Sequence, residues 1–272
     1  MTPFLKMHGL GNDFAVFDAR KQALALDERL ARAISDRRRG IGCDQVIVIE
    51  PSDEADAFMR IRNADGGEVE ICGNAARCVA RLLMAETGRG TVRLQTLAGP
   101  LACRAAGDLI AVEMGSPEFR WNMVPLARPV DTGNFALQAG GKEFSATALS
   151  MGNPHCVLFV EDAEKADVAA LGPKIETDPL FPARTNVEFV SVRDRSHIRM
   201  RVWERGAGIT LACGSGACAA AVAAINRGLT EAAVEVRLDG GVLKLEWHGG
   251  PVRMTGPAAL AYRGEIDLKA CA

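Results

Sequence analysis

An internal duplication is the feature that most constrains how this chain can fold. Residues 60–80 read RIRNADGGEVEICGNAARCVA, and residues 201–221 read RVWERGAGITLACGSGACAAA. The two segments align without gaps and place Cys72 on Cys213, which are 141 positions apart (213 minus 72). A repeat of this length, with a Cys-Gly pair in both copies, indicates that one structural unit occurs twice.

The same offset relates further polar positions outside these two segments. Asn12 aligns with Asn153 and Gln45 with Asn186, again 141 positions apart. One offset across separate segments predicts a duplicated domain, and 272 residues are enough for two domains of about 100–150 residues each. The turn at 116–118 is the expected junction. We therefore expect one domain over 1–117, completed by 263–272, and a second domain over 118–262.

A predicted helix follows each cysteine motif. The segment after Cys72 has helical spacing as far as Thr87 and stops at Gly88, and the segment 214–226 ends before Gly228. Helical spacing also predicts helices over 24–38 and 163–171. Apolar or alternating runs predict strands in both copies, which together give an α/β fold. The predicted strands are 4–7, 14–17, 46–49, 58–62, 92–97, 109–114, 156–160, 187–192, 197–203, 234–238, 241–247 and 252–255.

The composition argues against nucleic acid and membranes as partners. The net charge is −2, and the one dense basic patch, Arg37-Arg38-Arg39, is interpreted as a solvated helix end. The longest run of small apolar residues, 211–225, is too short to span a membrane. The N-terminus does not resemble a secretion signal. We therefore expect a cytoplasmic protein whose eight cysteines are reduced.

The chemistry expected of Cys72 and Cys213 follows from their place before a helix. Unpaired N–H groups and a partial positive charge at a helix N-terminus lower the pKa of a nearby thiol and bind anions. Two such helix ends could hold one carboxylate and stabilise the charge that grows when its α-carbon loses a proton. If the copies face each other, two thiols would lie on opposite sides of one cleft. That geometry suits moving a proton from one face of a carbon to the other.

The cysteines allow two other interpretations, a packing role and a metal site. A single cysteine before a helix is often an ordinary small buried residue, but two at matched positions favour a function. A metal site is disfavoured because Cys72/Cys78 and Cys213/Cys218 have C-x5-C and C-x4-C spacings, unlike the C-x2-C pair of a structural zinc site. The remaining cysteines are expected to pack in the core or lie on the surface. These are Cys43, Cys103, Cys156 and Cys271.

The positions at which the copies differ are candidates for binding an asymmetric ligand. Arg205 can hold a second carboxylate, while Glu204 and His155 can tune or relay protons near the thiols. Their counterparts in the first copy are Ala64, Asn63 and Phe14. A set of side-chain amides could read amino and carboxylate groups. The set comprises Asn12, Gln45, Asn63, Asn74, Asn153 and Asn186.

These motifs, taken together, resemble the diaminopimelate epimerase family. The resemblance is carried by KMHGLGNDF (6–14), RIRNADGGEVEICGNAARC (60–78), MGNPH (151–155), RTNVEFV (184–190) and WERGAGITLACGSGAC (203–218). It implies the interconversion of LL- and meso-diaminopimelate in lysine and peptidoglycan precursor biosynthesis, without pyridoxal phosphate or metal. The implied fold has two α/β domains, each a mixed sheet wrapped around a central helix, with the active site in the cleft between them. Ala75 is a small departure, since the family often has Gly there.

The resemblance also implies roles for individual residues. Cys72 and Cys213 would be the catalytic base and acid, exchanging roles with reaction direction, and His155 and Glu204 would tune their pKa values. Family members form homodimers, and Tyr262 matches a dimer-contact tyrosine. The residues implied to contact substrate are Asn12, Gln45, Asn63, Gly73, Asn74, Asn153, Asn186, Glu204, Arg205, Gly214 and Ser215.

Two alternative functions stay open at this point. A proline or hydroxyproline racemase would use a similar pair of cysteines, but its substrate lacks a distal amino-acid head, so Arg205 and the amide set would be surplus. A thiol-rich zinc or redox buffer would need the thiols without the substrate-binding residues.

Overall fold

The computed structural model describes residues 1–271, and the chain divides into two compact units. Unit 1 comprises Met1–Val112 and the chain from Gly256 onward, and unit 2 comprises Glu113–Thr255. Both predicted boundaries differ from these units, because residues 113–117 were expected in the first domain and belong to unit 2, and residues 256–262 were expected in the second domain and belong to unit 1. The second difference has a clear structural cause. The reason is β18 (Ala259–Ile266), an antiparallel partner of β1 (Thr2–Gly9).

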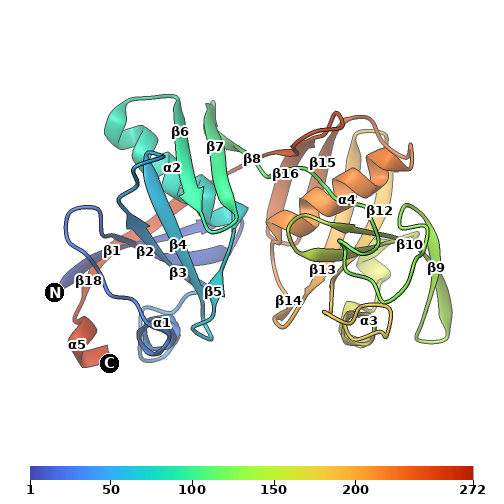
Figure 1. Cartoon of the computed structure of the whole chain (residues 1–272), viewed down its shortest axis with the longest axis horizontal. Coiled ribbons are helices and arrows are strands. Elements are labelled where there is room, and N and C mark those ends of the chain that lie inside the picture. The colour runs from blue at the N-terminus through green and yellow to red at the C-terminus, as the bar shows by residue number, and fades with distance from the viewer. Residues whose placement is uncertain (272) are drawn as a thin grey trace. The chain divides into compact units, whose positions relative to one another are not determined.

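Unit 1 is built mainly of strands, with one long helix (Figure 1). Strands with apolar residues on buried positions alternate with short turns, and the termini of the chain meet through β1 and β18. Besides β1 and β18, the elements are β2 (Asn12–Asp18), α1 (Glu28–Ser35), β3 (Gln45–Glu50), β4 (Ala57–Asn63), β5 (Glu68–Val69), α2 (Gly73–Thr87), β6 (Thr91–Thr96), β7 (Gly99–Ala106), β8 (Leu109–Glu113) and α5 (Leu268–Cys271).

Unit 2 repeats this order of elements. Its long helix follows the second cysteine motif, as α2 follows the first. The elements are β9 (Phe135–Ala139), β10 (Lys142–Ser150), β11 (Pro154–Phe159), the 3-10 helix η1 (Ala163–Lys165), α3 (Val168–Glu176), β12 (Asn186–Asp194), β13 (His197–Glu204), β14 (Gly208–Ile209), α4 (Gly214–Asn226), β15 (Ala233–Leu238), β16 (Gly241–Glu246) and β17 (Arg253–Gly256).

Strand register shows the duplication at the level of single residues. In unit 1, β2 and β3 are parallel with Phe14 opposite Gln45, and in unit 2, β11 and β12 are parallel with His155 opposite Asn186. Both pairs are related by the 141-residue offset seen in the sequence. The prediction of two duplicated α/β domains is therefore confirmed.

The helix that follows each cysteine lies against the sheet of its own unit (Figure 1). In unit 1, α2 contacts β1, β6 and β7, and it ends at Gly88, whose left-handed φ of 70° a glycine adopts without strain. In unit 2, α4 contacts β10, β11, β12, β13, β15 and β16. Its run of alanines, residues 219–221, is fully buried, because small side chains let a helix approach the surrounding strands closely. Each sheet therefore wraps around a central helix.

Helix boundaries outside the cysteine motifs differ from the predictions. The predicted helix over 24–38 is the shorter α1, because Asp27 caps its N-terminus by accepting a hydrogen bond from the Leu30 N–H at 2.7 Å. The predicted helix over 163–171 is η1 followed by α3, which Asp167 caps in the same way. Within residues 1–271, the helices are all too short or too polar to cross a membrane.

Candidate active site

Cys72 lies at the N-cap of α2 with extended backbone, so its side chain sits beside the open N–H groups of the helix. Its Sγ is 3.8 Å from Asn12 Oδ1, which also accepts a hydrogen bond from Asn74 Nδ2 at 3.2 Å. The thiol is partly exposed.

A carboxylate fixes the orientation of the Asn12 amide. Asn12 Nδ2 donates to Asp44 Oδ2 at 3.0 Å, so Oδ1 must face Cys72. Arg37 holds Asp44 at 2.7 Å and Asp13 at 2.8 Å, and the Asp44 carbonyl accepts from the Ala64 N–H. Arg37 was interpreted from the sequence as part of a solvated helix end. Its side chain is exposed, and it also supports the site through these two carboxylates. Asp44 was not predicted as a site residue, because the spacing of these residues along the chain gives no sign of its role.

Four more predicted residues lie in unit 1. Gln45 Nε2 donates to Asn63 Oδ1 at 2.9 Å, across the adjacent strands β3 and β4. Asn74 is buried on the first turn of α2 behind Gly73, and Arg77 Nη2 donates to Asn74 Oδ1 at 2.7 Å. Arg77 is itself fully buried, so Asn74 is held rigidly.

Cys213 occupies the matching N-cap of α4, but its surroundings differ from those of Cys72. Its Sγ accepts from the Gly216 N–H at 3.3 Å and lies 3.6 Å from Ser215 Oγ. Gly214 begins the helix. Cys213 is only 5% exposed, so ionising it takes a charge out of water unless a ligand or neighbour compensates.

Burial raises the pKa of the Cys213 thiol well above its ordinary value, and the nearby Glu204 and Glu188 raise it further. Hydrogen bonds from Gly216 and Ser215 act in the opposite direction and do not offset burial. The expectation that the helix end gives a lowered pKa is therefore wrong for Cys213. The physical reason is that desolvation disfavours the thiolate more than the cap stabilises it.

Glu204 is a half-buried acid close to Cys213. Burial raises its pKa, while hydrogen bonds with Thr210 and Cys213 lower it. The Thr210 hydroxyl donates to the Glu204 carboxyl group. The Glu204 carboxyl group is therefore a weaker acid than an exposed one.

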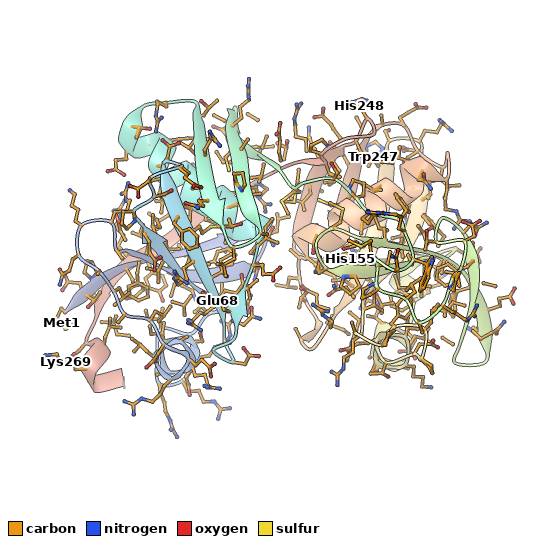
Figure 2. The ribbon with its side chains drawn as sticks, viewed as in Figure 1. Met1, Glu68, His155, Trp247, His248 and Lys269 are labelled. Carbon is orange, nitrogen blue, oxygen red and sulfur yellow. The ribbon has the colours of Figure 1, made fainter. Side chains whose placement is uncertain are left out.

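His155 lies on β11 in the interior of unit 2 (Figure 2). Its Nδ1 is 2.7 Å from Glu188 Oε1, and both side chains are fully buried. Its Nε2 is 2.9 Å from Asn153 Oδ1, and Asn153 Nδ2 donates to Ser215 Oγ at 3.3 Å. The predicted residues His155, Asn153 and Ser215 are therefore in one hydrogen-bonded group.

Glu188 is the residue of this group that the sequence analysis missed. It aligns with Ile47 at the 141-residue offset, as His155 aligns with Phe14. Both positions are apolar in the first copy and ionisable in the second. A Glu flanked by apolar residues in the strand, and matched to Ile in the repeat, was the available signal.

Asn186 joins two backbone segments of unit 2. Its Oδ1 accepts from the Arg205 N–H at 2.9 Å, and its Nδ2 donates to the Pro154 carbonyl at 2.9 Å. These bonds fix the position of the turn that carries Glu204 and Arg205. The exposed Arg205 guanidinium donates to the Ala183 carbonyl at 3.2 Å, a weak contact that a carboxylate could replace.

Tyr262 lies on β18 of unit 1. It is about half exposed and packs edge-on against Phe4, with ring centroids 6.0 Å apart. Leu260 on the same strand is also exposed. This strand offers an apolar surface on unit 1.

The predicted site residues thus form one group in each unit, apart from Tyr262. The structure describes each group within its own unit. We call them the N-terminal half-site (Asn12, Gln45, Asn63, Cys72, Gly73 and Asn74) and the C-terminal half-site (Asn153, His155, Asn186, Glu204, Arg205, Cys213, Gly214 and Ser215).

Comparison with known proteins points to one family. The sequence model described as "Diaminopimelate epimerase" matches residues 4–120 and 147–261. A diaminopimelate epimerase of Rhodospirillum centenum is 53% identical over 97% of this chain and 92% of its own length. One of Rhizorhabdus wittichii is 52% identical over 98% and 96%, respectively.

Solved structures at low identity show the same fold. A hydroxyproline epimerase from Agrobacterium vitis, with trans-4-hydroxy-L-proline bound, superposes with a TM-score of 0.71 at 17% identity, covering 97% of this chain and 90% of that one. A phenazine biosynthesis PhzF-family protein from Enterococcus faecalis also gives 0.71 at 17% identity, covering 98% and 99%. At this identity the likeness concerns the fold and not the substrate.

Proposed function

Because the chain belongs to the diaminopimelate epimerase family, and so epimerises diaminopimelate, we propose that Cys72 and Cys213 are the base and acid that move its α-proton. One observation carries the proposal: both thiols occupy the N-cap of a central helix, at positions related by the 141-residue duplication. In the proposal one thiol acts on each face of the reacting carbon.

The reaction needs one thiolate and one thiol. The thiolate takes the α-proton, so the carbon–hydrogen bond breaks and an S–H bond forms while the electron pair stays on the substrate. The opposite thiol then gives its proton to the other face of the carbon. The two sulfurs exchange roles with reaction direction, which is LL to meso or the reverse. Their pKa values therefore belong to a coupled pair.

The carbanion is the high-energy species, because an α-proton is far less acidic than a thiol. The first residues of both helices, Gly73-Asn74 and Gly214-Ser215, offer N–H groups to the carboxylate attached to the reacting carbon. Fixed donors at this position stabilise the charge that develops in the transition state. In this proposal the side chains and helix ends do the chemistry, with neither pyridoxal phosphate nor a metal ion.

Selectivity for a substrate with a second amino-acid head is assigned to the polar residues around the thiols. Arg205 is exposed and can hold the distal carboxylate in a bidentate pair. Glu204 and the side-chain amides would contact the amino and carboxylate groups. These amides are Asn12, Gln45, Asn63, Asn153 and Asn186. Asn186 also fixes the turn that bears Arg205.

The proposal extends to a cytoplasmic homodimer that works in lysine biosynthesis. Tyr262 and Leu260 are exposed on β18, and an apolar edge of this kind suits contact with a second copy. Tyr262→Asp should shift the protein to monomer in sedimentation at micromolar concentration. An unchanged sedimentation coefficient would remove the tyrosine from the contact.

Two substitutions test the function. Cys72→Ser and Cys213→Ser should each lower kcat on LL-diaminopimelate by about 10²-fold or more, because each removes one acid–base group. Cys103→Ser is a matched control, since Cys103 is a buried thiol on β7. Wild-type kcat in either test variant would refute two-base catalysis. Turnover of proline or hydroxyproline in place of diaminopimelate would refute the assigned substrate.

A further inference from the structure

A continuous row of hydrogen-bonding groups runs from a buried acid to the sulfur of Cys213. Glu188 Oε1 lies 2.7 Å from His155 Nδ1, and His155 Nε2 lies 2.9 Å from Asn153 Oδ1. Asn153 Nδ2 donates to Ser215 Oγ at 3.3 Å, and Ser215 Oγ lies 3.6 Å from Cys213 Sγ. We call these five residues the Glu188 chain.

We propose that Glu188 is a positioning residue for Cys213, and that the Glu188 chain couples the charge of the sulfur to the protonation of the Glu188–His155 pair. The inference rests on the proposed role of Cys213 as acid and base, and it adds a residue that this role did not include. It concerns contacts within unit 2 alone.

The direction of the chain follows from the two unlike ends of the Asn153 amide. The oxygen only accepts hydrogen bonds and the nitrogen only donates them. When His155 Nε2 carries a proton, it donates a hydrogen bond to Asn153 Oδ1. The Asn153 Nδ2 group then donates a hydrogen bond to Ser215. The Ser215 hydroxyl can then donate to sulfur, which favours the Cys213 thiolate. In this state a second proton is shared between His155 Nδ1 and Glu188.

The reverse direction follows when the Glu188–His155 pair loses that shared proton. The Glu188 carboxylate then accepts from His155 Nδ1–H, and Nε2 presents a lone pair. Asn153 turns over, so that its nitrogen donates to Nε2 and its oxygen accepts from Ser215. Ser215 in turn accepts from the Cys213 S–H, which favours the thiol. The Asn153 amide rotates but does not transfer protons. The Cys213 sulfur and the Glu188–His155 pair therefore exchange their protons with substrate and solvent.

Burial makes Glu188 the group that biases this chain. The side chain is fully buried, and its Oε2 has no hydrogen-bond partner within residues 1–271. A carboxylate left in that state is costly, so sharing a proton with His155 is favoured. The first copy has Ile47 and Phe14 at the matching positions, and Cys72 therefore lacks this chain. The two thiols thus differ before any substrate binds.

The ring nitrogens of His155 give a direct readout that needs no catalysis. Four histidines are present, so ¹⁵N-histidine labelling with a His155→Gln reference identifies the signal. Cys213→Ala should shift the His155 ring nitrogens, because the far end of the chain has lost its partner. In a Ser215→Ala background, the same Cys213→Ala change should produce no shift. An unshifted His155 signal in folded Cys213→Ala protein would overturn the coupling.

Kinetics test the positioning role. Glu188→Gln and Ser215→Ala should each lower kcat by about tenfold, and the double variant should lose no more than the worse single one, because both break one chain. For Glu188→Gln, KM should stay within about twofold of wild type, since Glu188 does not touch substrate.

A second buried carboxylate provides the control. Glu176→Gln alters a carboxylate bonded to Trp203 and Gly206, and its effect should multiply with that of Ser215→Ala. Multiplying losses for Glu188→Gln and Ser215→Ala would overturn the positioning role. The two proposals can be refuted independently. Wild-type kcat in Cys213→Ser would refute the proposed function, whereas the His155 ring-nitrogen signal tests the coupling through the Glu188 chain without any measurement of catalysis.

Discussion

Asn12 and Asn153 occupy matching positions in the two half-sites, but different neighbours hold their side chains. Asn12 is oriented by the Asp44 carboxylate, and Asn153 contacts the His155–Glu188 pair. The sequence predicted both asparagines because the duplication aligns them. It did not predict the carboxylates, because each contacts its partner across parallel strands and not at a fixed spacing along the chain.

The Asn12 orientation leads to a prediction for Asp44. Asp44→Ala should let the Asn12 amide turn, lowering kcat about fivefold and the free energy of unfolding by about 1 kcal/mol, because charge-assisted hydrogen bonds at an exposed carboxylate are lost. Asp53→Ala, at an exposed turn, is the control. Steady-state kinetics and urea unfolding measure the two effects. An unaltered kcat in Asp44→Ala would show that Asn12 does not need this anchor.

A second prediction at this scale concerns the pH dependence set by Glu204. The Glu204 carboxylate raises the pKa of Cys213, so removing its negative charge should lower that pKa. In the direction that uses Cys213 as base, kcat rises with pH as the thiol ionises. Glu204→Gln should therefore move the midpoint of this rise to lower pH.

The control for this pH prediction is Glu231→Gln, which alters an exposed carboxylate paired with Arg195. Full pH profiles of kcat in both reaction directions measure the shift. A midpoint that moved to higher pH in Glu204→Gln would contradict the assigned effect of Glu204 on Cys213.

Helix α4 has glycine where α2 has alanine at the third position of its first turn, and this difference follows from its neighbours. Gly216 aligns with Ala75, which is fully buried in α2 without disturbing it. A Cβ added at Gly216 would lie 2.8 Å from Glu188 Oε1 and 3.2 Å from Cys213 Sγ. Glycine is therefore required in α4 because a buried carboxylate and the sulfur occupy the space of the methyl group.

This comparison predicts unequal effects for the two helices. Gly216→Ala should lower kcat about tenfold and destabilise the protein by about 1–3 kcal/mol, since Glu188 must move away from His155. Ala75→Gly should cost only about 1 kcal/mol, from helix propensity, and change kcat little. Thermal unfolding with kinetics on both variants measures this. Equal losses of kcat in the two variants would contradict the account of the α4 end.

For the whole molecule, the features predicted from the sequence are mostly those that occur in both copies of the duplication. The 141-residue offset predicted the paired cysteines, and the parallel strand pairs of both units follow it. Six strands were not predicted, namely β5, β7, β9, β10, β14 and β18. In β18 most residues are exposed, and β10 is rich in Ser, Thr and Ala, so neither strand has the alternation of large apolar residues that reveals a strand.

The candidate residues were easier to predict than the interactions that control them. Cys72, Cys213, His155 and Glu204 follow from motif and alignment. The raised pKa of Cys213 does not, because it depends on burial by residues distant in sequence. Desolvation is a property of the folded chain, and a helix-end motif alone gave the wrong direction.

The central claim is that two thiols act on opposite faces of one stereocentre, and isotope labelling tests it most directly. LL-diaminopimelate is incubated with the protein in D₂O, and both isomers are isolated while little has reacted. The account predicts deuterium at the α-carbon of the meso product and none in the recovered LL substrate, because the base removes the original proton and a different group supplies the new one. Equal deuterium in product and recovered substrate would indicate a single base and contradict the account.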